Sequence, residues 1–294
     1  MSKLQPAHSP SASMAVETFD LVRRFQDFVA VDNLNLTVRR GSFFGFLGPN
    51  GAGKSTTIKM LTGLLAPTSG KIRVLGRDLS AEPLEVKRRI GVVPEDLNLF
   101  ERLTGAEMLA FTGRMYGLQK AEIAGRAPEL LDLMELLSEP KKLIVEYSHG
   151  MKKKLALACA LIHRPEILFL DEPFEGIDAI ASRTLKDLLS RLTARGLTVF
   201  LTSHVLEIVE RLCSDIAIIS QGKLLAAGSL DELRKGIQLE GDSQPAGRGQ
   251  PGLVGQQEGL IGEHAGPISL EEYFIHIVGG ERSAGEEEVL QWLT

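Results

Sequence analysis

The sequence is poor in cysteine, tryptophan and long apolar runs. Its 294 residues include one tryptophan and two cysteines, Cys159 and Cys213. The cysteines lie far apart and lack the spacing of metal ligands, so we do not expect a metal site built on them. Both have apolar neighbours in the sequence, which favours buried packing positions in a reducing compartment.

A membrane-spanning segment is also missing. No run of residues approaches the roughly 20 apolar positions that a transmembrane helix needs. Residues 1–15 are polar and rich in Ser, Pro and Ala, and they lack the continuous apolar segment of a signal peptide. We expect this stretch to be a disordered tail. A function at a membrane would therefore require a separate partner protein.

The chain has no excess of positive charge. Its net charge is -5 at pH 7, which gives no support to a nucleic-acid partner. Hydrophobic residues make up 44% and charged residues 24% of the sequence, as in an ordinary globular protein. The length allows one or two domains.

The most informative stretch is a glycine-rich turn between a predicted strand and a predicted helix. Residues 43–47 form a short apolar run, long enough for a buried strand. Residues 48–56 then fit the pattern G-x-x-x-x-G-K-[ST]. We call them the phosphate loop. Its members are Gly48, Pro49, Asn50, Gly51, Ala52, Gly53, Lys54, Ser55 and Thr56.

This pattern suits the binding of phosphate groups. Glycine lets the backbone approach a phosphate closely, and successive N–H groups then form an anion-binding concavity. The N-terminus of the following helix adds a partial positive charge. Lys54 supplies a full positive charge, and the Ser55 hydroxyl is placed to bind Mg²⁺. An incidental glycine-rich connection is the alternative, and the four fixed positions and the flanking elements argue against it.

Two further predicted strands end in polar residues suited to phosphate chemistry. Residues 167–170 are apolar and are followed by Asp171 and Glu172, and the strand at 198–201 leads to His204. In parallel sheets, ligands gather at the carboxyl ends of strands. Asp171 is then a candidate Mg²⁺ ligand and Glu172 a candidate general base for an attacking water. A charge pair at the start of a helix is the alternative interpretation.

Ser148 precedes a predicted helix whose apolar residues share one face. Its simplest role is a helix cap. This helix N-terminus is also a second anion site in a chain with one phosphate loop. A symmetric dimer would account for it, because each copy could offer Ser148 to a phosphate held by the other.

The remaining sequence divides into segments of different composition. Residues 30–38 predict a strand, and residues 220–223 predict a hairpin turn between two others. Residues 97–165 are predicted to form a helical subdomain inserted into an α/β domain of residues 16–235. Within this subdomain, residues 104–107 form a capping box from Thr104 to Glu107 that opens one helix, and residues 129–137 predict a second helix with a leucine-rich face. Residues 236–267 are rich in Gly and Pro and read as a flexible linker. Residues 268–280 open on a capping box and predict a docking helix, followed by an acidic tail at 281–294.

Together these motifs resemble the nucleotide-binding subunit of an ATP-binding cassette (ABC) transporter, over roughly residues 17–233. The phosphate loop matches the Walker A loop, and residues 167–172 match the Walker B strand. Residues 147–151 stand at the family's signature Leu-Ser-Gly-Gly-Gln, and we call them the signature segment. Residues 176–178 resemble the D-loop. His204 resembles the switch histidine, and Phe25 stands where the family stacks an aromatic ring on adenine.

The resemblance implies an α/β fold: a P-loop NTPase core with a mostly parallel sheet, an N-terminal antiparallel β subdomain and an inserted helical subdomain. It also implies a head-to-tail homodimer, or a pseudo-dimer with a paralogous subunit, that closes around two MgATP. This dimer would drive a separate polytopic membrane permease from the cytoplasmic face of the membrane. Lys54, Glu172 and His204 would serve catalysis, and Ser55, Asp171 and Glu95 would bind Mg²⁺. Nucleotide contacts outside the phosphate loop would come from Phe25, Glu95, Ser148, Gly150 and Asp178.

Two motifs depart from the family pattern. Glu95 replaces the glutamine of the Q-loop, and it adds negative charge near the triphosphate. In the signature segment, His149 replaces the first glycine and Met151 the glutamine. The Pro-Glu and Ser-x-Gly-Met sequences resemble the exporter group called ABC-2 type.

Two other functions fit less well. A soluble ABC ATPase acting on nucleic acid or ribosomes usually carries two cassettes or long coiled-coil insertions, and neither is found here. A P-loop GTPase would need a guanine-reading Asn/Thr-Lys-x-Asp stretch, which is absent. It would also leave Ser148 and His204 unexplained.

Overall fold

The computed structural model describes residues 13–233 and Phe274. Contacts between residues divide the chain into one compact unit of residues 1–227 and another of residues 228–294. The predicted linker and acidic tail lie outside the described residues, as do residues 1–12 and, apart from Phe274, the predicted helix 268–280.

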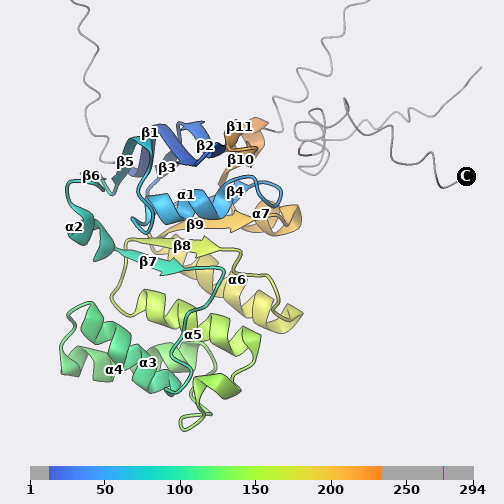
Figure 1. The fold of residues 1–294 in the computed structure, drawn as a ribbon. Coiled ribbons are helices and arrows are strands. Elements are labelled where there is room, and N and C mark those ends of the chain that lie inside the picture. Colours follow the sequence, from blue (N-terminus) through green and yellow to red (C-terminus); the bar gives the residue numbers. More distant parts are fainter. Residues whose placement is uncertain (1–12, 234–273, 275–294) are drawn as a thin grey trace, which may run out of the picture. The chain divides into compact units, whose positions relative to one another are not determined.

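An antiparallel sheet is built from the first part of the chain (Figure 1). Its strands run in the order β2-β1-β5-β6, and β3 pairs with the other end of β1. They are β1 (Met14–Phe25), β2 (Phe28–Leu34), β3 (Thr37–Arg39), β5 (Ser69–Val74) and β6 (Arg77–Asp78). The N-terminal antiparallel β subdomain is thus confirmed.

Two boundaries in this sheet differ from the prediction. The tail was expected to reach residue 15, but β1 begins at Met14 because Ala15 is fully buried and its carbonyl accepts a hydrogen bond from Leu75 (2.8 Å). One strand was expected over residues 30–38, and the structure has two. At the break, the Thr18 hydroxyl donates to the Leu34 carbonyl (2.8 Å) and accepts from the Leu36 N–H (2.8 Å), so two backbone groups find a partner outside the ladder.

A second sheet carries the phosphate loop. Its strand order is β11-β10-β4-β9-β8-β7, and the strands from β10 to β7 are parallel. They are β4 (Phe43–Leu47), β7 (Ile90–Val93), β8 (Ile167–Asp171), β9 (Thr198–Ser203), β10 (Asp215–Ser220) and β11 (Lys223–Ser229). The three strands β4, β9 and β8 are neighbours, so their carboxyl ends meet at one edge of the sheet.

Helix α1 (Lys54–Leu61) contacts strands of both sheets, β2 and β8, and helps to close the core between them. Three phenylalanine rings from β4 and β8 surround Phe200 of β9, with centroid distances of 5.4–5.6 Å. Each fully buried ring of this kind contributes roughly 1.5–3 kcal/mol. This packing holds the strands that carry the polar residues of the sheet edge.

The other helices of the core unit are α2 (Pro83–Lys87), α5 (His149–Leu161), α6 (Ala179–Ala194) and α7 (Leu206–Leu212). Helix α5 contacts β7, α6 contacts β9, and α7 contacts both β4 and β9. The two cysteines are free and buried, as expected. Burial raises the pKa of the Cys159 thiol to about 11.

The inserted helical subdomain contains α3 (Gly105–Met115), α4 (Lys120–Leu133) and the 3-10 turn η1 (Ile144–Glu146) (Figure 1). The capping box at Thr104 is confirmed, since the Thr104 N–H donates to the Glu107 carboxylate (2.8 Å) and Glu107 donates back to the hydroxyl (3.3 Å). The second helix was expected over residues 129–137, which was wrong. A cap at Gln119 starts it earlier, and Glu135, with φ of 58°, lies beyond its end.

Candidate active site

The phosphate loop turns tightly between β4 and α1. Gly53 has φ of 106°, in the left-handed region that favours glycine. A Cβ atom on Gly53 would lie 2.5 Å from the Ala30 carbonyl oxygen, so a side chain cannot be accommodated there. No side chain caps α1, and the first N–H groups of this helix are therefore left for an anion.

A pocket of about 390 Å³ opens over this loop. It gathers residues from the phosphate loop, from the ends of β7, β8 and β9, and from β2. Its lining is formed by Phe28, Ala30, Asn50, Gly51, Ala52, Gly53, Lys54, Ser55, Thr56, Glu95, Glu172, Glu175 and His204. The structure thus brings together most of the phosphate loop and three of the predicted residues outside it, namely Glu95, Glu172 and His204.

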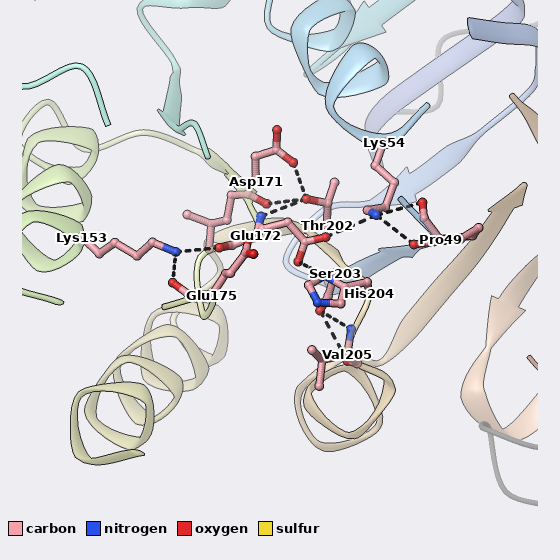
Figure 2. A network of polar contacts seen from close by, with 12 residues as sticks. Pro49, Lys54, Lys153, Asp171, Glu172, Glu175, Thr202, Ser203, His204 and Val205 are labelled. Atoms are coloured by element: carbon pink, nitrogen blue, oxygen red, sulfur yellow. Dashed lines mark hydrogen bonds and ion pairs between the residues drawn. The ribbon is translucent and has the colours of Figure 1, made fainter. Parts of the chain in front are cut away.

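Lys54 is the first residue of α1 and is only 6% exposed. Its ammonium group donates to the carbonyls of Gly48 (2.8 Å) and Pro49 (3.3 Å) and lies 3.3 Å from Oε1 of Glu172 (Figure 2). The ammonium group of Lys54 is thus hydrogen-bonded to two backbone carbonyls of the phosphate loop. A phosphate group would compete for the same donors.

Glu172 is the centre of the polar network. Its carboxylate is largely buried and lies between two nitrogen atoms: Oε1 faces Lys54, and Oε2 lies 3.1 Å from Nδ1 of His204 (Figure 2). Oε1 makes no hydrogen bond within the described residues, although it is buried. Because Oε1 has an ion-pair partner in Lys54 but no hydrogen bond, it can accept a proton from a water molecule in the pocket once that ion pair loosens.

Thr202 of β9 joins the two acidic residues of β8. Its hydroxyl donates to Oδ1 of Asp171 (2.6 Å) and accepts from the backbone N–H of Glu172 (3.1 Å). Asp171 is buried, with 3% exposure. The hydrogen bonds follow from the register of the sheet, because Asp171 is paired directly with Thr202.

The acidic groups around the pocket affect one another. Burial is the largest cause that raises the pKa of Glu95, and the charges of Asp171, Glu175, Asp96 and Glu172 add to it in that order. The repulsion between these carboxylates means that the pocket has a local excess of negative charge. A divalent cation would relieve it, and the hydroxyl and carboxylate oxygens at this edge are ligands that Mg²⁺ prefers. Within the described residues, no group of three or more His, Cys, Asp or Glu side chains is placed to hold a metal on its own.

The signature segment lies at the start of α5, away from the lining of this pocket. Ser148 is exposed and caps α5, accepting a hydrogen bond from the Met151 N–H (3.2 Å). Asp178 caps α6 through the Ala181 N–H (2.8 Å), and this bond is the main cause that lowers the pKa of Asp178. A Cβ atom on Gly150 would lie 3.9 Å from the Asp178 carboxylate, so the two helix starts are neighbours.

Phe25 is not part of the pocket lining. Its ring lies 4.4 Å from the guanidinium of Arg23, and 43% of the residue is exposed. Phe28, at the start of β2, does line the pocket and is 63% exposed. Sequence reasoning singled out Phe25 alone, although both aromatic residues flank the same turn.

The sequence motifs did not identify three other residues that line or support this site, namely Glu175, Thr202 and Lys153. Glu175 follows the Asp-Glu pair by three residues, and Thr202 lies two residues before His204, so both could have been examined as extensions of their motifs. Lys153 is one of three consecutive lysines, and no sequence pattern separates it from the other two.

The profile of the family "ABC transporter" matches residues 31–175. The chain belongs to the ABC transporter ATP-binding proteins.

Two curated relatives are similar over most of their length. The bacitracin transport ATP-binding protein BcrA of Bacillus licheniformis is 40% identical over 224 residues, which are 76% of this chain and 72% of that protein. The daunorubicin/doxorubicin resistance ATP-binding protein DrrA of Streptomyces peucetius is 41% identical over 223 residues, which are 76% of this chain and 68% of that protein.

A solved structure of a dimeric ATP-binding cassette, bound to ADP and Pi in a post-hydrolysis state, has a TM-score of 0.67 and 25% sequence identity. The match covers 73% of this chain and 98% of that chain. The family and the fold thus make this ABC subunit a nucleotide-binding ATPase. Among the described residues, no helix is long and apolar enough to cross a bilayer.

Proposed function

We propose that two copies of this ABC subunit bind two MgATP at their interface, and that hydrolysis drives a separate membrane permease. Each nucleotide would lie between the phosphate loop of one copy and the signature segment of the other. The observation that carries this proposal is the Glu172 carboxylate, which faces Lys54 and His204 at the pocket over the phosphate loop.

In this proposal, Lys54 exchanges the Gly48 and Pro49 carbonyls for the outer phosphates of ATP. Backbone N–H groups of the phosphate loop and the N-terminus of α1 bind the phosphate oxygens. Because Lys54 moves toward the phosphates, its pairing with Glu172 weakens. The carboxylate is then available to take a proton from the attacking water.

His204 holds Oε2 of Glu172 and orients the carboxylate, while it also reaches the pocket. Ser55 and Asp171, with Glu95 nearby, would hold Mg²⁺. When bound, this ion supplies positive charge that neutralises the phosphate oxygens. The nucleotide base would stack on an aromatic ring at the turn between β1 and β2, where Phe25 and Phe28 lie.

The signature segment supports the dimeric arrangement. Ser148 and the N-terminus of α5 are exposed, so the γ-phosphate of an ATP held by a partner copy can reach them. Gly150 and Asp178 lie beside it and would complete the contact. A cassette from the same fold family is dimeric in its ADP-bound and Pi-bound state.

The direction of transport is inferred from the relatives. One is named for transport of bacitracin and one for resistance to daunorubicin and doxorubicin, and a further relative is named for export of Nod factor. We therefore infer an export function of ABC-2 type. The subunit would lie at the cytoplasmic face of the membrane and be held there by the permease.

The test uses Glu172→Gln, which keeps the shape of the side chain and removes the base. We expect this variant to bind ATP without hydrolysing it and to accumulate as a dimer in size-exclusion chromatography with MgATP. Wild type without nucleotide should run as a smaller species. A Glu172→Gln chain that stays monomeric and hydrolyses ATP at the wild-type rate would reject the role of Glu172.

A further inference from the structure

Lys153 is an unusual lysine. It lies on α5, five residues after Ser148, and is 5% exposed. Among the described residues, Lys54 and Lys153 are the only buried lysines. Lys54 has a role in the phosphate loop, whereas the buried charge of Lys153 has no role in the mechanism given above.

The partners of Lys153 are two backbone carbonyls on either side of the turn that follows β8. Its ammonium group donates to the carbonyl oxygen of Glu172 (2.9 Å) and to that of Glu175 (Figure 2). The neighbouring lysines make different contacts, because Lys152 pairs with the Glu101 carboxylate (2.8 Å) and Lys154 with the Glu135 carboxylate.

The surroundings of Lys153 make these two hydrogen bonds important. Its stem borders a small apolar cavity whose other walls are Val93, Leu157, Leu170, Pro173 and Leu185. Burial lowers the pKa of Lys153, and the charges of Glu175, Glu172 and Glu95 oppose that change. A buried ammonium group must be hydrogen-bonded, so the two carbonyls and the lysine hold one another in place.

The backbone at Glu172 needs such support. Glu172 has φ of 46°, in the left-handed region that residues with a Cβ atom rarely adopt. Its N–H is held by the hydroxyl of Thr202, and its carbonyl accepts from Lys153 and from the Glu175 N–H (3.2 Å). Both ends of the residue are thus fixed, and the direction of the carboxylate toward His204 depends on this backbone conformation.

We propose that Lys153 is a positioning residue that holds the Glu172–Glu175 turn, and so aims the general base from the helix that begins with the signature segment. The inference rests on the proposed function, because it assumes that Glu172 is the base. It adds a mechanical link: a displacement of α5 moves the ammonium group and therefore the backbone of Glu172.

The test compares Lys153→Met with Lys152→Met in the full chain. Methionine retains an unbranched stem and removes the ammonium donors. For Lys153→Met we expect kcat for ATP hydrolysis to fall by about tenfold or more, since small misplacements of catalytic groups have effects of this size. The dissociation constant for ATP should stay within about twofold of wild type, because the phosphate loop is untouched. Lys152→Met should leave both quantities unchanged.

A second comparison asks whether Lys153 acts through Glu172. In a Glu172→Gln background, Lys153→Met should cause no further loss of the residual hydrolysis rate, because residues that act as a unit are not additive. An equal loss in both backgrounds would overturn the proposal, as would a wild-type kcat for Lys153→Met. If Lys153→Met fails to fold, Lys153→Gln takes its place with the same expectations, because glutamine removes the ammonium charge and its side chain is one bond shorter than that of lysine.

The two proposals fail in different ways. A wild-type rate for Glu172→Gln would reject the base. A strongly impaired Glu172→Gln together with an unimpaired Lys153→Met would reject only the positioning role.

Discussion

Nδ1 of His204 lies 3.1 Å from Oε2 of Glu172, and the two residues come from the ends of neighbouring strands. The histidine side chain is 41% exposed, whereas that of Glu172 is 8% exposed. His204 thus joins the buried carboxylate to the open part of the pocket. The relationship places a group that can donate or accept a proton beside the candidate base.

Replacement of His204 by alanine should therefore impair hydrolysis more than binding. We expect kcat for His204→Ala to fall by roughly 100-fold or more, since groups that take part in general acid–base catalysis contribute about 10²- to 10⁴-fold. Steady-state ATPase assays give kcat, and equilibrium titration with a fluorescent ATP analogue gives the affinity. A variant that loses affinity while keeping kcat would show that His204 only binds nucleotide.

Two inactive variants should complement one another if each site is shared by two chains. Lys54→Ala disables the phosphate loop of its own chain, and Ser148→Arg blocks the signature segment that its chain offers to a partner. Each homodimer should lose activity. In an equal mixture, about half of the dimers are mixed and one of their two sites is intact, so about a quarter of wild-type ATPase activity should return.

The control for this experiment is Lys59→Ala, which changes an exposed lysine of the same helix. In a mixture with Ser148→Arg, activity should come from the Lys59→Ala homodimers, whose two sites are intact, and from the mixed dimers, which have one intact site. No recovery in the Lys54→Ala and Ser148→Arg mixture would contradict the head-to-tail dimer.

The Thr202 hydroxyl should matter for both stability and catalysis. Thr202→Val keeps the shape of the side chain and leaves the Asp171 carboxylate and the Glu172 N–H without this partner. Loss of a buried hydrogen bond of this kind costs about 1–3 kcal/mol. We expect kcat to fall by about tenfold as the carboxylates shift. Chemical denaturation and ATPase assays measure the two effects.

Thr198→Val is the matched control. Thr198 lies on the same strand β9, is 1% exposed, and its hydroxyl accepts a hydrogen bond from the Gly41 N–H (2.9 Å) at the opposite edge of the sheet. It should lose stability but retain kcat. Equal effects of both variants on kcat would mean that the loss reflects general destabilisation.

The free energy of unfolding should depend on pH through Glu166. Its hydrogen bond with Arg89 is the main cause that lowers the pKa of Glu166, and Arg40 contributes further. A carboxylate whose pKa is lower in the folded state stabilises the fold above its unfolded pKa, and this stabilisation is lost as the pH falls through the folded value. Because the Glu166 side chain is 42% exposed, solvent screening limits the contribution to about 1 kcal/mol or less.

Glu166→Gln should therefore lower the free energy of unfolding at pH 7, and the difference from wild type should shrink as the pH falls below about 4.3. Urea denaturation at several pH values measures it. Glu85→Gln, which removes an exposed partner of Arg88, is the control and should have a smaller effect at every pH. A difference for Glu166→Gln that is constant with pH would contradict the assigned ion pair.

The predicted elements were most accurate where local chemistry decides them. The phosphate loop, the strand before Asp171, the Thr104 capping box and the turn at Gln221-Gly222 depend on residues close in sequence, and the structure has each of them. The boundary errors in the antiparallel sheet arose where a distant partner decides. The break after Leu34 depends on the Thr18 hydroxyl, which lies 16 residues earlier.

The sequence by itself determined that this chain has one phosphate-binding loop, two strand ends with acidic or histidine side chains, and a capped helix that offers Ser148. Each of these depends on consecutive residues and on the period of a strand or helix. Only the tertiary structure decided that Glu172 faces both Lys54 and His204, that Thr202 joins Asp171 to Glu172, and that Lys153, not Lys152 or Lys154, points at the Glu172–Glu175 turn. The reason is physical: these contacts depend on the strand order β4-β9-β8 and on the rotation of α5 against the sheet, and both are fixed by packing between residues far apart in the chain.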